Sequence, residues 1–111
     1  MEQTSNIPIS SNANITVRKQ QVPESEEHPI GIDFAVIGQV MRDGEYEAVI
    51  QIDNSAHRRE VGTHIHFFDR KSKDGPLVRP AREIVNAEQA YEYVSKYLEK
   101  QYGHLMDEHE R

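Results

Sequence analysis

Residues 32–53 read IDFAVIGQVMRDGEYEAVIQID, and this stretch decides the predicted fold. Apolar and polar residues alternate on both sides of Asp43-Gly44, and a two-residue Asp-Gly loop is the strongest short-range signal for a β-hairpin. The simplest register continues unbroken from that turn into both strands. The paired residues are then Arg42 with Glu45, Met41 with Tyr46, Gln39 with Ala48, Ile37 with Ile50, and Ala35 with Ile52.

This register divides the hairpin into two faces, because directly paired residues share a face of the sheet. The predicted core face carries Met41, Ile37, Ala35, Tyr46, Ala48, Ile50 and Ile52. The opposite face carries Phe34, Val36, Gly38, Val40, Glu47, Val49, Gln51 and Asp53. This face carries more apolar surface than a solvated sheet face normally shows. We therefore expect a cover over that face: a second subunit in a homodimer, the N-terminal segment, or a partner protein.

A third strand is predicted from Thr63 to Asp69, where the letters HIHFF alternate. Ile65 and Phe67 point to one side and are expected in the core. His64 and His66 point to the other side, the face predicted for Asp53 and Gln51. A short fourth strand is expected within residues 77–85, at the sheet edge because Pro80 interrupts it.

A C-terminal helix follows, with Asn86 as its N-cap and Gln89 three residues later, as in a capping box. An apolar stripe recurs at helical spacing, and Gly103 is expected to end the helix. The predicted fold is α+β: a three- to four-stranded antiparallel sheet, made of the Asp-Gly hairpin and the HIHFF strand, with one C-terminal helix packed on one face.

The expected organisation has three parts. Residues 1–31 are polar and contain three prolines, which predicts a mostly flexible N-terminal arm. Residues 32–103 form a single α+β domain, and residues 104–111 form a frayed C-terminal tail. A chain of 111 residues supports one modest core.

Composition excludes several classes of function. The absence of cysteine rules out disulfides, thiol catalysis and thiolate metal sites. No apolar run approaches the roughly 20 residues that span a bilayer, and a signal-peptide pattern is missing, so a cytoplasmic location without membrane contact is expected. Neither a glycine-rich phosphate loop nor a dinucleotide fingerprint occurs, so no cofactor is expected.

The charge is unevenly distributed. The whole chain carries a net charge of -6, whereas residues 57–82 contain seven Lys or Arg against three Asp or Glu. This asymmetry indicates that an anionic partner or substrate meets the middle of the chain.

Three histidines in this basic segment, His57, His64 and His66, allow two kinds of chemistry. The pair at i and i+2 on a strand can chelate a divalent metal, with His57 or Asp53 as third ligand. Alternatively, a neutral imidazole and an imidazolium can serve as general base and acid near neutral pH. The plainest interpretation is a pair of partly exposed polar residues on a solvated face.

The neighbouring Arg58 and Arg59 extend the metal-free alternative. Arginines hold phosphate bidentately and stabilise charge that develops at phosphorus. Histidines and arginines together are the groups that an RNA-cleaving enzyme needs, in which the ribose 2′-hydroxyl attacks its own phosphate. Two solvated loop arginines are the competing interpretation.

Residues 46–66, YEAVIQIDNSAHRREVGTHIH, resemble the TumE-like family, small proteins found as candidate toxins of bacterial and archaeal toxin–antitoxin pairs. In that family a strand runs into Asp-Asn-x-x-His, and His-x-His follows after a polar loop, which is shorter here. Asp53, Asn54 and His57 match the first part, and His64 and His66 match the second.

The resemblance implies an antitoxin protein and RNA as partners, and a metal-independent, ribonuclease-like activity. The implied catalytic residues are His57, His64 and His66, and the implied substrate-binding residues are Arg58, Arg59, Asp53 and Asn54. Two alternatives stay open at this point: a non-catalytic homodimeric interaction domain in which the histidines are incidental, and a metal-binding domain that uses His64, His66 and His57.

Overall fold

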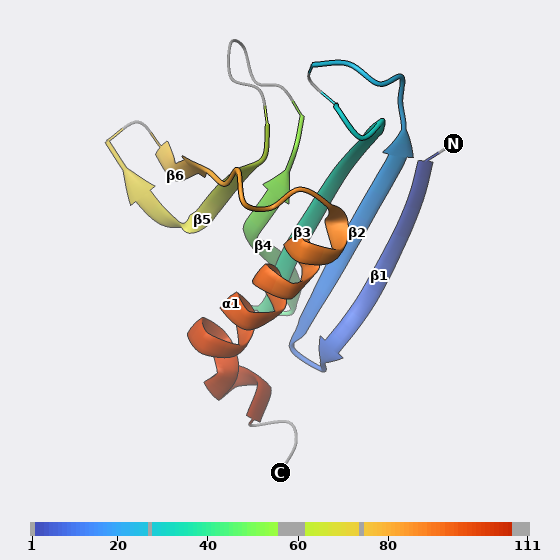
Figure 1. Cartoon of the computed structure of the whole chain (residues 1–111). Helices are drawn as coiled ribbons and strands as arrows, with labels where there is room; N and C mark the ends of the chain where they lie inside the picture. The colour runs from blue at the N-terminus through green and yellow to red at the C-terminus, as the bar shows by residue number, and fades with distance from the viewer. Residues whose placement is uncertain (1, 27, 56–61, 74, 108–111) are drawn as a thin grey trace.

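The computed structural model shows an antiparallel sheet covered on one face by a helix (Figure 1). It describes residues 2–26, 28–55, 62–73 and 75–107. Within these residues the strands lie in the sheet in chain order, each paired with the next. They are β1 (Glu2–Ser10), β2 (Ala13–Gln21), β3 (Ile32–Arg42), β4 (Glu45–Asp53), β5 (His64–Ser72) and β6 (Gly75–Pro80), followed by α1 (Ala87–Asp107). The α+β prediction is confirmed.

The predicted count of three to four strands is wrong, because β1 and β2 add a hairpin to the sheet. Both strands lie in the segment predicted to be a mostly flexible arm. Ala13 and Ile15 on β2 are fully buried, and β2 pairs with β3 along its whole length. Apolar residues at alternate positions of a polar strand were enough to give it a core face.

The Asp43-Gly44 turn forms as predicted, with φ angles of 51° and 84°. Positive φ at both central residues is the geometry whose twist matches that of the flanking strands. Beyond the turn, the predicted register holds from Arg42↔Glu45 to Gln39↔Ala48.

A β-bulge then shifts the register between Gly38 and Gln39, so that Gly38 pairs with Ile50 and Ala35 pairs with Asp53. Val49 is the extra residue on β4. A one-residue shift reverses the face that each residue occupies relative to its partner strand. The predicted core face was therefore wrong for β3, and also for Tyr46 on β4, which pairs with Met41 on the open face and is 42% exposed. The helix-facing residues of β3 are Phe34, Val36, Gly38 and Val40, not Ala35, Ile37 and Met41.

At Gly38, α1 approaches the sheet closely. A Cβ built on Gly38 would lie 2.8 Å from Cγ2 of Ile50 and 2.8 Å from Cγ1 of Val94. Val94 and Leu98 on α1 are fully buried, and burial of each such side chain contributes about 1.5–3 kcal/mol. The helix packs on β2, β3 and β4, so the middle of the sheet is covered.

The two ends of α1 differ in how well they were predicted. Asn86 caps the helix as expected, since its Oδ1 accepts a hydrogen bond of 2.8 Å from the backbone N–H of Gln89. The predicted end at Gly103 is wrong, because α1 continues to Asp107. Leu105 packs against the core, and its carbonyl accepts a hydrogen bond from Nδ2 of Asn12. These contacts hold the additional turn against the segment that connects β1 and β2.

The homodimer was predicted because the open sheet face was expected to carry many apolar residues, and the structure shows fewer of them there. Four of the apolar residues assigned to that face lie instead under the helix, with at most 1% exposure: Phe34, Val36, Val40 and Val49. Phe68, which the alternation of β5 places on the open face with His64 and His66, is exposed, at 37%. The open face is consequently more polar than the unbroken register predicted.

Candidate functional site

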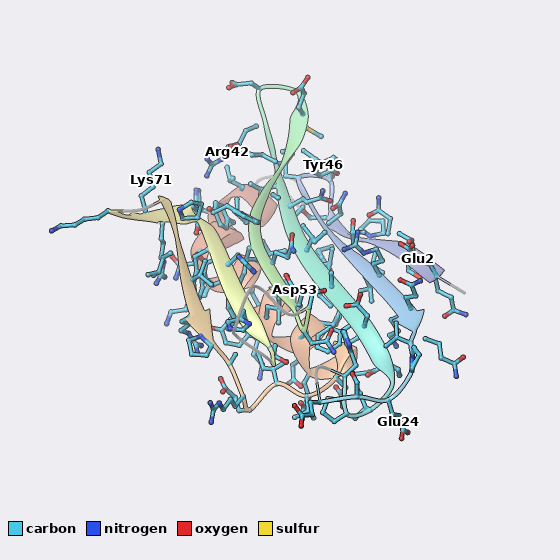
Figure 2. All side chains as sticks on the ribbon, turned by 90° about the horizontal axis from the view of Figure 1, so that it is seen from above. Glu2, Glu24, Arg42, Tyr46, Asp53 and Lys71 are labelled. Atoms are coloured by element: carbon cyan, nitrogen blue, oxygen red, sulfur yellow. The ribbon has the colours of Figure 1, made fainter. Side chains whose placement is uncertain are left out.

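The polar cluster of the open face is built by the pairing of β4 with β5. Asp53 pairs with His64 and Gln51 pairs with His66, so these four side chains share one face. Ile52 and Ile65, the pair between them, are fully buried on the helix side. Figure 2 shows Asp53 at the end of β4 that is remote from Arg42 and Tyr46 near the turn. The strands thus place Asp53, His64 and His66 on the side of the sheet opposite α1.

Asp53 is the centre of this cluster, with a side chain that is only 4% exposed. Its Oδ2 accepts a hydrogen bond of 2.8 Å from Nε2 of Gln51, and its Oδ1 accepts one of 3.2 Å from the backbone N–H of Ser55. Nε2 of His66 lies 3.3 Å from Oδ2. A buried carboxylate with such donors is fixed in position.

The two histidines differ in accessibility. His64 is 3% exposed, and its Nδ1 lies 3.0 Å from the carbonyl oxygen of Gly62. A carbonyl only accepts hydrogen bonds, so Nδ1 of His64 carries a proton and donates it to this oxygen. The His66 side chain is 18% exposed, and its ring stacks on Phe68 with 6.1 Å between centroids. His66 is therefore the histidine that a substrate reaches more easily.

Asn54 has a structural part in the cluster. Its Oδ1 accepts a hydrogen bond of 2.9 Å from the backbone N–H of Phe34, and its Nδ2 donates one of 2.8 Å to the carbonyl of Ile32. Both ends of the amide are occupied, and the residue is 6% exposed. Asn54 thus ties the end of β4 to the start of β3, and its contact with a substrate stays a prediction.

Three further polar residues that were not predicted for the site lie beside it. The hydroxyl of Ser55 donates a hydrogen bond of 2.9 Å to Oδ1 of Asp33, and Nε2 of His28 lies 3.7 Å from the same oxygen. The serine donates to the aspartate rather than to the histidine, so this trio is not a nucleophilic triad. The sequence places His28 in the expected flexible arm, whereas the β2–β3 pairing brings its loop to this end of the sheet.

The remaining predicted site residues, His57, Arg58 and Arg59, lie outside the described residues. Their roles in catalysis and phosphate binding stay predictions. The same holds for a metal site that includes His57. Among the residues that the structure does describe, no group of three or more His, Cys, Asp or Glu is placed to hold a metal ion.

A second polar cluster, on the helix side of β5, surrounds Asp69. Its carboxylate accepts hydrogen bonds from the hydroxyls of Tyr97, at 2.8 and 2.7 Å, and Tyr102, at 2.6 Å. Burial and then the contact with Asp69 raise the pKa of Tyr102 to about 12, and the same causes raise the pKa of Tyr97 further. Both phenols are neutral at physiological pH and cannot act as bases there. This cluster ties α1 to β5.

The chain matches no known protein-family model, no curated protein and no solved structure. Over the described ranges, no helix combines the length and hydrophobicity that crossing a bilayer requires.

Proposed function

We propose that the protein acts on RNA, with His66 as the acid–base group and Asp53 as the residue that orients it. The observation that supports this function is the contact of 3.3 Å between the Asp53 carboxylate and the His66 ring, whose side chain is 18% exposed on the sheet face opposite α1. A carboxylate that fixes an imidazole is a recurring arrangement in general acid–base catalysis. His64, two residues before His66 on β5 and paired with Asp53, supplies a second imidazole on the same face.

The proposed reaction is cleavage of the RNA backbone without a metal. Neutral His66 removes the proton of a ribose 2′-hydroxyl, and the resulting 2′-oxygen attacks the adjacent phosphorus. The 5′-oxygen of the next nucleotide leaves and takes a proton from an imidazolium, that of His64 or His57. The products are a 2′,3′-cyclic phosphate and a free 5′-hydroxyl, so atoms and charge balance. Arg58 and Arg59 are the proposed phosphate ligands.

The biological setting that we propose follows the resemblance of residues 46–66 to the TumE-like family. There the protein would be the toxin of a cytoplasmic toxin–antitoxin pair, and its partner would be a small antitoxin protein. Sequencing of the flanking DNA tests this setting: a gene for a small DNA-binding protein immediately beside this one would support it. An isolated gene that nevertheless encodes an active ribonuclease contradicts the setting and leaves the chemistry intact.

Expression in a bacterial host tests the function. We expect the wild-type protein to arrest growth and to degrade cellular RNA, and the His64→Ala/His66→Ala double variant to do neither. His104→Ala is the matched control, because His104 is exposed on α1, away from the cluster. Arrest that persists in the double variant overturns the histidine mechanism. If the wild-type protein causes no arrest and no RNA loss, the toxin function is wrong.

A second candidate is a non-catalytic homodimer through the open face. Exposed aromatic side chains on that face favour it: Tyr46 is 42% exposed and Phe68 is 37% exposed. Sedimentation of the purified protein would then show a dimer that Tyr46→Glu converts to a monomer. A monomeric wild-type protein rules out this candidate.

A further inference from the structure

A groove runs along the side of α1, away from the histidine cluster. The helix lies across the middle strands, whereas β5 and β6 extend beyond it on one side (Figure 1). The groove between them has a volume of about 370 Å³. Phe67 and Tyr97 form its aromatic floor, and its cationic residues are Arg70, Arg79, Lys96 and Lys100.

Two arginines in the groove lie over aromatic rings. The guanidinium carbon of Arg70 lies 5.1 Å from the ring centre of Phe67 and 5.7 Å from that of Tyr97. Arg79 lies 5.8 Å over the ring of Tyr93 and donates a hydrogen bond of 3.1 Å to its hydroxyl. Such cation–π contacts stabilise the position of a guanidinium, and the Arg70 side chain remains exposed.

The acids near the groove are already engaged. Glu83 pairs with Arg79 at 3.6 Å and Glu92 pairs with Lys96 at 2.9 Å, while the Asp69 carboxylate accepts from two tyrosines. Arg70 and Lys100, by contrast, form no ion pair with any residue that the structure describes. In a protein of net charge -6, these two cations create a local site for an anion.

We propose that this groove binds the sugar–phosphate backbone of single-stranded RNA, with Arg70 and Lys100 on phosphates. The chemistry favours a nucleic acid over an acidic peptide, because bases stack on guanidinium planes and aromatic rings, whereas Asp and Glu side chains have no aromatic ring that can stack. A single strand is required, because its bases are free to stack on a protein surface. The groove lies on the opposite sheet face from His66, so this binding does not rest on the proposed cleavage.

The test is fluorescence anisotropy with a short, labelled, single-stranded 2′-O-methyl RNA, which lacks the 2′-hydroxyl that cleavage needs. We expect Arg70→Gln/Lys100→Gln to weaken binding about tenfold. Loss of two phosphate contacts should also reduce the slope of log affinity against log salt by about 1.4. The control, Arg18→Gln/Lys19→Gln on β2, makes the same change in net charge away from the groove, and it should bind like the wild type.

Three results would overturn the groove proposal. They are no measurable binding by the wild type, equal losses in the groove and control variants, and displacement of the RNA by a polyglutamate peptide at comparable concentration. Thermal melting of both double variants shows whether each is folded. Arg70→Lys with Lys100 intact is the second check, because it keeps the charge and should lose less affinity than Arg70→Gln alone. Binding to uncleavable RNA without growth arrest would support the groove and contradict the cleavage proposal.

Discussion

Asp53 on β4 and His66 on β5 meet across the sheet, with 3.3 Å between Oδ2 and Nε2. They belong to two residue pairs on the same sheet face, Asp53↔His64 and Gln51↔His66, which are separated by the pair Ile52↔Ile65 on the other face, so the contact is diagonal. Side chains on diagonal positions of one face are within reach when they are long or aromatic. The sheet backbone therefore sets the geometry of the pair, and Gln51 and Ser55 fix the carboxylate.

Replacement of Asp53 by Asn tests the orienting role. The amide keeps the size of the side chain but loses the charge that holds the imidazole and stabilises the imidazolium. We expect the rate constant for RNA cleavage to fall about 100-fold with little change in KM. Asp43→Asn in the β3–β4 turn is the matched control, since Asn also accepts positive φ. Unchanged cleavage by Asp53→Asn would remove Asp53 from the mechanism.

The close approach at Gly38 predicts opposite effects of one substitution at two glycines. Gly38→Ala places a methyl group 2.8 Å from Ile50 and Val94, and such overpacking should lower the free energy of unfolding by about 1–3 kcal/mol. Gly103→Ala meets nothing within 4 Å and lies inside α1, so it should raise that free energy by about 1 kcal/mol. Urea denaturation measures both. A stable Gly38→Ala variant would contradict the described packing of α1.

The raised pKa of Tyr102 predicts a loss of stability at high pH. The phenol has its ordinary pKa of 10.0 in the unfolded chain and a pKa of about 12 in the folded protein. The contribution of this phenol to the free energy of unfolding is complete below pH 10. It is lost as pH rises toward 12, because Tyr102 ionises first in the unfolded chain. Above pH 10, the free energy of unfolding should therefore fall less steeply with pH in Tyr102→Phe than in the wild type, by up to about 1.4 kcal/mol per pH unit. Parallel stability curves for the two proteins, from urea titrations at several pH values, would contradict this assignment.

Local signals in the sequence predicted the elements that depend on few residues. Asp43-Gly44 specifies its turn through positive φ, and Asn86 with Gln89 specifies the start of α1 through side-chain hydrogen bonds. The alternation around His64 and His66 placed both on one face of β5. Each of these features depends on residues that are close together in the chain, so the local sequence pattern is enough to predict it.

The features that were missed depend on contacts between distant segments. The bulge at Val49 lies beside Gly38, where α1 approaches the sheet, and Val49 and Ile50 are both buried. A glycine within a strand is a known sign of a bulge or a close approach, and Gly38 carries that sign in the sequence. β2 looked too polar to be ordered, but its pairing with β3 satisfies its backbone. The burial of His64 likewise could not be read from the alternation.

The most direct test of the central claim is cleavage of a defined RNA by purified protein, with analysis of the product ends. We predict that the wild type yields 2′,3′-cyclic phosphate and 5′-hydroxyl ends, that a 2′-deoxy substitution at the scissile nucleotide blocks cleavage, and that His66→Asn lowers the rate at least about 100-fold. His104→Asn should cleave like the wild type. Equal cleavage by His66→Asn and the wild type would contradict the claim that His66 is the acid–base group.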